Sequence, residues 1–366
     1  MTSMLALRAH SRTDTLVLED IPIPSPGPSE VLVKVVAAGL AAGIMRLLAL
    51  GAFKHLPTTL GHEAAGIVAA VGGEVTGIAV GDRVRVHPHL NCRNCKYCHS
   101  DREMMCTMQA TVGHASHGDV AKPLYAKYHN GGLAEYICVP HWLIDPLPDE
   151  ISFDTAAKLH DLANGVRALK CAHLPMGSTV VITAATGTMG TATVKLAEHF
   201  GVARLILIGR DLDRLQAVEK LSGSVPTDVI AIKELDEDWA STGVIGERLR
   251  ALAPEGADAV IDYVPEGPLT GNVLPALSVG GSLVHMGASF TPFTLSPSVL
   301  MYNCLRIVGT RANTRNDVHE VMRLLTSGTL AAEELITHRY ALTDAIKGVD
   351  AMQKRAEPMW MTVVNP

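Results

Sequence analysis

The sequence predicts an α/β protein in which a compact antiparallel β domain is followed by a doubly wound parallel sheet. Short strand-like runs separated by glycine and proline turns occupy the chain as far as Leu147, and from Asp154 onward helical and strand-like segments alternate. Regularly spaced short strands predict a β domain, whereas strands that alternate with helices predict a parallel sheet. The chain of 366 residues is long enough for two domains, each with its own core.

The expected strands of the first domain are short apolar runs that end at turn residues. A Pro-rich stretch over 22–28 closes an alternating N-terminal segment. Residues 155–169 are rich in alanine and leucine and predict a helix that leads into the second domain. The expected strands before that helix are 30–37, 66–71, 82–86, 132–139 and 143–147.

The second domain is organised around residues 178–210, which predict one βαβ unit. A buried strand over 180–182 precedes a turn of small residues, and a helix over 190–200 ends at Gly201 as its C-cap. A second buried strand follows at 205–208. Later helices of this domain are expected at 213–221, 243–253 and 268–277, with strands at 229–232, 259–262, 282–286 and 306–310. A short tail, with a segment at 318–325 and a final strand near 361–364, is expected to pack back on one of the two domains.

The turn inside this βαβ unit favours the binding of a dinucleotide over a plain buried crossover. Such a turn directs free backbone N–H groups and the positive end of a helix toward a pyrophosphate. The glycine pattern is degenerate, because Ala185 stands first. The candidate binding residues are Thr186, Gly187, Thr188, Met189 and Gly190.

The end of the second strand favours NADP(H) over NAD(H). An NAD-binding protein places an acidic residue there to hold the ribose 2′-hydroxyl, but this chain has Gly209 followed by Arg210, with Arg214 one turn later. Glycine leaves room for a 2′-phosphate, and a guanidinium can pair with it. Asp211 comes one residue late and is expected to cap the following helix.

Composition excludes several other classes of protein. The net charge is −6 without a long basic run, so nucleic-acid binding has no electrostatic support. The most apolar stretch is interrupted by Lys34 and Arg46, which leave 11 uncharged residues between them, too few to span a bilayer. The N-terminus lacks the pattern of a signal peptide. These features predict a cytoplasmic protein that does not bind membranes.

Four of the seven cysteines form a C-x2-C-x2-C-x7-C cluster. Four thiolates complete a tetrahedral shell around zinc and leave no place for water, so the site would be structural. An iron–sulfur cluster is the rival, but its last cysteine is often followed by proline, and here Thr107 follows. His87, His89 and His99 are surplus to such a site and are expected to be loop histidines. The candidate ligands are Cys92, Cys95, Cys98 and Cys106.

With these motifs in place, the chain resembles the zinc-containing alcohol dehydrogenase family, the medium-chain dehydrogenase/reductases, over essentially its whole length. The resemblance rests on the cysteine cluster, the dinucleotide turn and the segments 61–63, 81–84, 131–136 and 280–282. It implies a GroES-like catalytic domain over 1–155 and 311–366, with a zinc lobe at about 90–108, and a Rossmann domain over 156–310. It also implies a small-molecule substrate, a homodimer or homotetramer, and Val264, Met286 and Gly287 near the nicotinamide.

The sequence departs from the family at the second, catalytic zinc. The family's ligands there are a cysteine, the histidine of a Gly-His-Glu motif and a residue on the helix that enters the nucleotide domain. The histidine is His62, and the third position falls most closely on His160. The cysteine position is Ala41, the relay hydroxyl is replaced by Gly43, and the neighbouring carboxylate is replaced by Ile44.

Two interpretations of this altered site remain. In the first, which the triple replacement favours, the site has no zinc, and His62, Glu63, His160 and Asp161 bind substrate or handle protons. The expected activity is then NADP(H)-dependent reduction of a conjugated carbonyl or iminium, because hydride addition to such a bond needs no Lewis acid. In the second, His62, His160 and either Glu63 or Asp161 rebuild a zinc site for an alcohol dehydrogenase or aldehyde reductase. A non-redox family member that only binds a ligand is a third hypothesis.

Overall fold

The computed structural model describes residues 3–12, 16–116, 118, 120–355 and 357–366. The chain forms two compact units: unit 1 comprises Met1–His160 and Thr314–Pro366, and unit 2 comprises Asp161–Asn313. The units therefore divide after residues 160 and 313, whereas the sequence placed these boundaries at 155 and 310. Within the described ranges, no helix is both long and apolar enough to cross a membrane.

Unit 1 is built on a sheet with the strand order β10-β6-β5-β3-β18-β17, in which β9 also pairs with β3. Its neighbours run antiparallel, except that β17 and β18 are parallel. Smaller sheets have the orders β2-β1-β4 and β7-β8. The strands are β1 Ser3–Ala9, β2 Leu16–Pro22, β3 Glu30–Leu40, β4 Thr58–Thr59, β5 Ala64–Val71, β6 Arg83–Val86, β7 His89–Leu90, β8 Ala110–Thr111, β9 Tyr136–Pro140, β10 Ile144–Pro146, β17 Ile336–Ala341 and β18 Met361–Asn365.

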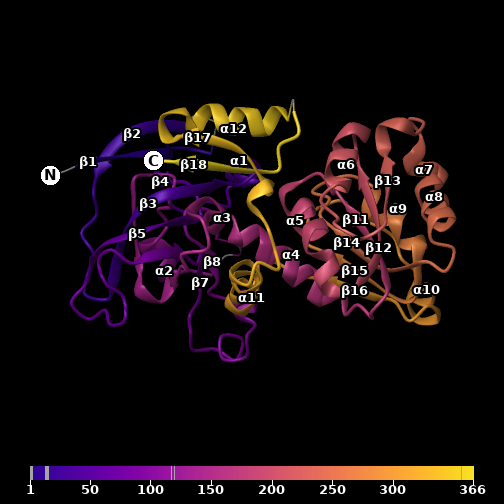
Figure 1. The fold of residues 1–366 in the computed structure, drawn as a ribbon, viewed down its shortest axis with the longest axis horizontal. Coiled ribbons are helices and arrows are strands. Elements are labelled where there is room, and N and C mark those ends of the chain that lie inside the picture. The colour runs from indigo at the N-terminus through magenta and orange to yellow at the C-terminus, as the bar shows by residue number, and fades with distance from the viewer. Residues whose placement is uncertain (1–2, 13–15, 117, 119, 356) are drawn as a thin grey trace. The chain divides into compact units, whose positions relative to one another are not determined.

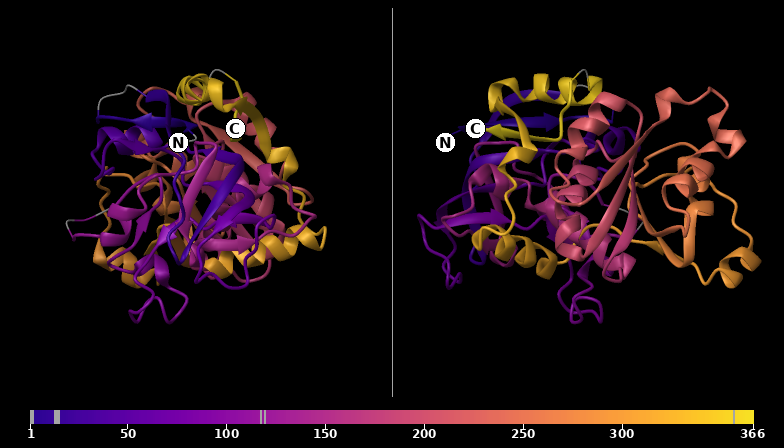
Figure 2. Two further views of the ribbon diagram at one scale, coloured as in Figure 1. Left: turned by 90° about the vertical axis from the view of Figure 1, so that its left-hand side faces the viewer. Right: turned by 45° about the vertical axis from the view of Figure 1, so that its right-hand side comes forward.

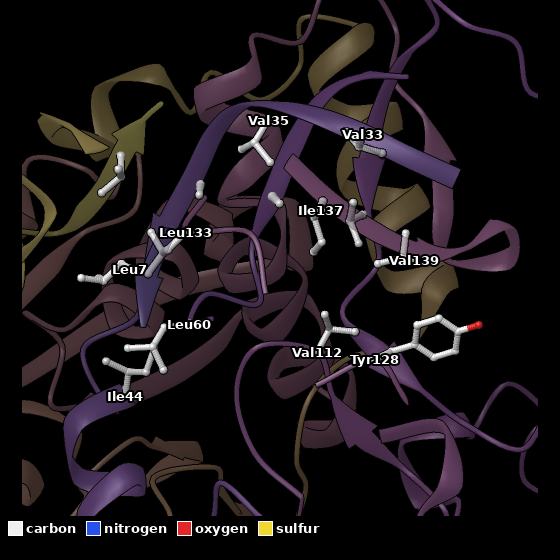
Figure 3. Close-up of a cluster of buried hydrophobic side chains, with 14 of the residues drawn as sticks. Leu7, Val33, Val35, Ile44, Leu60, Val112, Tyr128, Leu133, Ile137 and Val139 are labelled. Carbon is white, nitrogen blue, oxygen red and sulfur yellow. The ribbon is translucent and has the colours of Figure 1, made fainter. Parts of the chain in front are cut away.

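One interior is shared by the strands and loops of unit 1. Side chains from β1, β3, β9 and helix α1 (Ile44–Ala49) converge there (Figure 3). Tyr128 lies at its edge, and its hydroxyl donates to Glu30 Oε1 at 2.8 Å, so the aromatic ring is buried while the polar group keeps a partner. The further helices of this unit are α2 Pro123–Lys127, α3 Phe153–Ala157, α11 Arg315–Thr326 and α12 Ala345–Lys354.

Two expectations for unit 1 are wrong in detail. The helix expected over 155–169 is broken, because α3 ends at Ala157 and α4 (Leu159–Ala172) begins only after Lys158, whose N–H donates to Thr155 O at 3.0 Å in a tighter turn. The strand expected over 132–139 starts at Tyr136. The N–H groups of residues 131–133 instead donate to the carbonyls of residues 59, 61 and 60.

Unit 2 contains a sheet with the order β13-β12-β11-β14-β15-β16, and every neighbouring pair is parallel (Figure 1). The central strands are buried on both faces, as parallel strands covered by helices require. The predicted doubly wound parallel sheet is therefore confirmed. The strands are β11 Ser178–Thr183, β12 Val202–Gly209, β13 Thr227–Ala231, β14 Ala257–Asp262, β15 Leu277–His285 and β16 Arg306–Gly309.

Helices cover both faces of this sheet (Figure 2). The predicted βαβ unit is present: α5 runs from Thr188 to Leu196, continues as a 3-10 turn to Phe200, and ends at Gly201 with φ 71°. The other helices of unit 2 are α6 Leu212–Glu219, α7 Trp239–Thr242, α8 Val244–Leu252, α9 Leu269–Val273 and α10 Pro297–Tyr302.

Short 3-10 helices complete the connections in both units. They are η1 Glu103–Met105, η2 His141–Leu143, η6 Glu333–Leu335 and η7 Leu342–Asp344 in unit 1, and η3 Ala197–Phe200, η4 Ile232–Glu234 and η5 Leu274–Ala276 in unit 2.

Candidate functional site

The four clustered cysteines are arranged as a zinc shell. Cys92 Sγ lies 3.9 Å from Cys98 Sγ, and Cys95 Sγ lies 3.6 Å from Cys98 Sγ. Ligands held about 2.3 Å from a central ion at tetrahedral angles are about 3.8 Å apart, so these separations match a zinc shell. All four sulfur atoms lie within 4.8 Å of one another. The residues therefore fit a structural zinc.

Backbone N–H groups directed at the sulfur atoms of Cys95 and Cys106 suit a metal site. The backbone N–H of Cys98 is the main cause that lowers the pKa of Cys95, to about 6, whereas burial raises the pKa of Cys98 to about 12. The backbone N–H of Cys92 donates to Cys106 Sγ at 3.5 Å. A thiolate is the form that binds zinc, and backbone N–H groups directed at sulfur stabilise that form.

A second group of possible ligands brings together His62, Glu63 and His160. Their ligand atoms lie within 4.8 Å of one another, and all three side chains are buried. His62 Nε2 is 3.5 Å from Glu63 Oε1, and the rings of His62 and His160 meet edge to face with centroids 4.8 Å apart. Asp161 is not a member of this group among the described residues; it is the first residue of unit 2.

Local backbone structure fixes these side chains. His62 and Glu63 lie between β4 and β5, directly after Gly61, whose φ of 96° and hydrogen bonds to Gly113 and Gly132 hold the turn. His160 is the second residue of α4, which begins after the break at Lys158. The broken helix therefore delivers both Lys158 and His160 to the group.

Further histidines surround this group, and the sequence did not place them there. His114 lies 4.4 Å from His62, and His89 lies 5.2 Å from His160, measured between ring centroids. His87 packs against His89 at 5.2 Å. The expectation of a loop histidine is wrong for His89, which lies in β7, whereas His87 lies in the connection between β6 and β7 as expected; both are buried, each only 2% exposed.

Burial keeps the imidazoles of His62 and His160 neutral. It lowers the pKa of His62 well below the ordinary 6.5, and His114 and then Lys158 lower it further. Burial likewise lowers the pKa of His160, with His62 as the next cause. A neutral imidazole can donate a hydrogen bond or bind a metal, but it is not a strong acid at neutral pH.

Lys158 is the residue of this site that the sequence missed. Its ammonium contacts Glu63 Oε2, and both side chains are only 1% exposed. The ammonium is also 3.5 Å from Leu40 O. Gly39 makes room for the pair, because a β-carbon there would lie 1.9 Å from Glu63 Oε2. Only the turn between two helical segments brings this lysine inward, so a sequence pattern cannot reveal it.

The three positions at which the sequence is expected to depart from the family lie around the start of α1. Ala41 follows β3 directly, Gly43 is the residue before α1, and Ile44 is its first residue. Ile44 is 3% exposed and belongs to the apolar core of unit 1. None of these side chains can bind a metal or transfer a proton.

In unit 2, the predicted cofactor residues gather at one edge of the sheet. Residues 186–190 follow β11, Gly209 ends β12, Val264 follows β14, and residues 286–287 follow β15. Because these strands are parallel neighbours, their carboxyl ends share one edge, which is where open α/β sheets bind ligands. The structure thus brings these predicted residues together.

The turn after β11 is compact. A β-carbon at Gly190 would lie 2.6 Å from Ala185 O, so glycine is required for α5 to start this close to the strand. Gly187 caps the helix without a side-chain hydrogen bond. The first N–H groups of α5 therefore suit a phosphate, and this turn fits a dinucleotide.

Lys233, which lies in η4 after β13, brings a third cation to the segment after β12, and the sequence did not indicate it. Asp211 caps α6, as predicted, by accepting the N–H of Arg214 at 3.4 Å, and its other oxygen accepts from Lys233 Nζ at 3.2 Å. Lys233 lowers the pKa of Asp211 most, followed by the N–H of Arg214. The backbone N–H of Lys233 donates to Arg210 O at 3.0 Å. Pairing with Lys233 offsets the charge of Asp211, the carboxylate that follows Arg210 in the chain.

A buried carboxylate supports the strand ends where the nicotinamide residues were expected. Asp262 is 0% exposed and accepts hydrogen bonds from Thr270 Oγ1 at 2.8 Å and from the N–H of Val264 at 3.2 Å. It also pairs with His285 Nδ1 at 2.6 Å. This network fixes the segments that carry Val264 and Met286.

Comparison with known proteins agrees with the two-part architecture. Residues 27–149 match the alcohol dehydrogenase GroES-like domain, and residues 188–327 match the zinc-binding dehydrogenase domain. The chain is 26% identical over 353 residues to L-threonine 3-dehydrogenase of Deinococcus deserti, covering 95% of this chain and 96% of the relative. It is 27% identical over 337 residues to L-idonate 5-dehydrogenase of Vitis vinifera, covering 90% and 86%.

A solved structure of similar fold comes from Sinorhizobium meliloti 1021 and is described as a zinc-binding dehydrogenase bound to NADP. It has a TM-score of 0.84 and 26% identity, with 100% of each chain covered. These matches define a dehydrogenase with a GroES-like domain and a Rossmann domain, as the sequence predicted. The chain belongs to the zinc-containing alcohol dehydrogenase family, the medium-chain dehydrogenase/reductases. It is an oxidoreductase of a family that acts on small molecules.

Proposed function

We propose that this protein is an NADP(H)-dependent reductase of a conjugated carbonyl or related electrophile, and that it works without a catalytic zinc. The observation that carries the proposal is the buried contact between Lys158 and Glu63 beside His62. Glu63 is the only carboxylate in the group of possible ligands found among the described residues, and Lys158 already gives it a positive partner. Ala41 replaces the thiolate that would complete a zinc shell.

The cofactor, when bound, supplies the hydride that adds to the β-carbon of the conjugated bond. The electron pair of that double bond then moves toward the carbonyl oxygen, and the α-carbon takes one proton to complete the reduction. His62 and His160 are neutral, so they support this step by donating hydrogen bonds to the enolate oxygen. Their lowered pKa values favour this role over direct transfer of the proton, which comes from solvent.

One observation favours the rebuilt zinc site as a second candidate. The ligand atoms of His62, Glu63 and His160 lie within 4.8 Å of one another, and two neutral imidazoles with one carboxylate are a sound donor set for zinc. Such a metal would polarise the oxygen of an alcohol or aldehyde. The positive charge of Lys158 at Glu63 opposes it.

Metal content and substrate class together test the proposed function. We expect one zinc per chain, none in Cys106→Ser, and NADPH oxidation with α,β-unsaturated ketones or aldehydes but not with their saturated counterparts. Elemental analysis and the absorbance of NADPH measure these outcomes. Two zincs per chain in the native protein, together with oxidation of simple alcohols, would establish the alternative. A protein that binds no NADPH would revive the non-redox hypothesis.

Arg210 and Lys233 should together set the preference for NADP(H). We expect Arg210→Ala to weaken binding of 2′,5′-ADP by about tenfold to a hundredfold, the usual contribution of a hydrogen bond to a charged group. Lys233→Met should weaken it less and, because Asp211 is then uncovered, should also lower the preference for 2′,5′-ADP over 5′-AMP. Calorimetric titration with the two nucleotides measures both effects.

The control for this cofactor prediction is Lys220→Met, which removes an exposed lysine at the end of α6. It should leave both affinities unchanged, and all variants should bind 5′-AMP alike. If native protein binds 5′-AMP as tightly as 2′,5′-ADP, the assignment of NADP(H) is wrong.

We also infer that the protein is a homodimer or homotetramer joined through unit 2. The support is β16, an edge strand of the sheet, together with exposed apolar side chains on α10 and β16: Met301 is 63% exposed, Tyr302 77% and Ile307 42%. Large exposed apolar patches often mark protein contacts. Sedimentation equilibrium gives the mass directly, and a single-chain species would contradict the inference.

A further inference from the structure

A buried ammonium lies against one of the possible metal ligands, because Lys158 contacts Glu63 with both side chains only 1% exposed. We propose that the ammonium of Lys158 supplies the positive charge that a second metal ion would otherwise bring to this site. Removing that charge should turn His62, Glu63 and His160 into a zinc site. This inference rests on the zinc-free function proposed above and names the residue responsible for it.

The contacts of Lys158 place its charge where a metal ligand would otherwise act. The ammonium contacts Glu63 Oε2 and approaches Leu40 O at 3.5 Å, next to Ala41, the position of the family's cysteine. Both charged side chains are 1% exposed, so water screens them little. Lys158 therefore links the carboxylate to the backbone of the residue before Ala41.

The backbone is shaped for this ion pair. A β-carbon at Gly39 would lie 1.9 Å from Glu63 Oε2 and 2.9 Å from Lys158 Cδ. The N–H of Gly39 donates to Glu63 O at 2.7 Å, which fixes the carboxylate's own backbone. Any larger residue at position 39 would displace one of the two charged groups, so the pair is built into the fold of unit 1.

Charge balance explains why the pair excludes a divalent ion. The charges of Glu63 and Lys158 cancel, so this buried pair carries no net charge without a metal. A divalent ion would add two positive charges to a buried site whose only carboxylate already has a cationic partner. Without the ammonium, Glu63 needs a cation, and its ligand atom already lies within 4.8 Å of those of His62 and His160.

Lys158 is accordingly a positioning residue that acts through Glu63 and His62. Its contact with Glu63 Oε2 leaves Oε1 3.5 Å from His62 Nε2. Lys158 thus fixes the carboxylate that lies beside this imidazole.

The test is the zinc content of Lys158 variants purified from zinc-supplemented cultures. We expect native protein to hold one zinc per chain, and Lys158→Met and Lys158→Gln to hold two. Lys158→Arg keeps the positive charge and should hold one, as should Lys34→Met, which removes an exposed lysine of β3. The arginine variant separates charge from packing, because it changes the shape of the side chain but not its charge.

Each outcome decides a different point. Two zincs in native protein would overturn the proposed zinc-free function. One zinc in native protein and in both neutral variants would overturn only the role of Lys158. Two zincs in Lys158→Arg would show that packing excludes the ion. If both neutral variants fail to fold even with zinc present, the inference is also wrong, because bound zinc should replace the lost charge beside Glu63.

Discussion

His62→Phe should lower kcat for NADPH-dependent enone reduction by about 10²–10³-fold, the usual loss when one donor to a developing oxyanion is removed. His62 is buried and neutral, and its Nδ1 makes no hydrogen bond to the described residues. That nitrogen is therefore suited to face a substrate oxygen, while Nε2 lies toward Glu63. Phenylalanine keeps the ring but donates no hydrogen bond.

The matched control for this variant is His129→Phe. His129 also has a pKa lowered by burial, but it bonds Thr58 Oγ1 at 3.0 Å and lies outside the group of possible ligands. It should keep native kcat. The affinity for NADPH should not change in either variant, because the proposed cofactor residues belong to unit 2. A kcat for His62→Phe within threefold of native would remove His62 from the reaction.

The sequence predicted features whose residues are close together along the chain. The cysteine cluster lies within one short segment, and the dinucleotide turn joins a strand directly to its helix. Spacing alone determines such local geometry, so the predicted shell and the predicted βαβ unit needed no knowledge of distant residues. Asp211 is a similar case, because a helix cap acts within three residues.

The features that the sequence did not reveal depend on contacts between distant segments. Lys158 reaches Glu63 across 95 positions, and only because the helix breaks at Lys158. No periodicity predicts that break, since alanine and leucine on both sides favour one continuous helix. His89 and His114 join the site by the same kind of long-range packing. Packing between distant segments, not local propensity, brings these residues into the site.

Unit 1 should lose stability steeply in mild acid, at a pH where most carboxylates are still ionised. Burial lowers the pKa of His62, His87 and His160 well below 6.5 in the folded state. The unfolded chain therefore binds more protons below pH 6.5. The stability from the three neutral imidazoles is fully present above that pH and is lost as pH falls toward the folded pKa values. The loss should approach about 1.4 kcal/mol per pH unit for each histidine, or about 4 kcal/mol for three.

Denaturant unfolding at pH 8, 6.5 and 5.5 measures this slope. Trp239 is in unit 2, so a Trp239→Phe background lets the fluorescence of Trp142 and Trp360 report on unit 1 alone. This separation matters because two units need not unfold together. Release of the lobe zinc in acid would add to the slope, but equally in all variants that keep the four cysteines.

His87→Phe isolates one histidine and should flatten the slope below pH 6.5 by about 1.4 kcal/mol per pH unit. Burial is the first cause of its lowered pKa; His89, Arg85 and Arg315 lower it further, whereas Asp145 raises it. Because His87 is outside the group of possible ligands, its change should leave zinc content unaltered. If the free energy of unfolding falls equally with pH in native protein and in His87→Phe, His87 accepts its proton while still folded. Burial would then not hold this imidazole neutral.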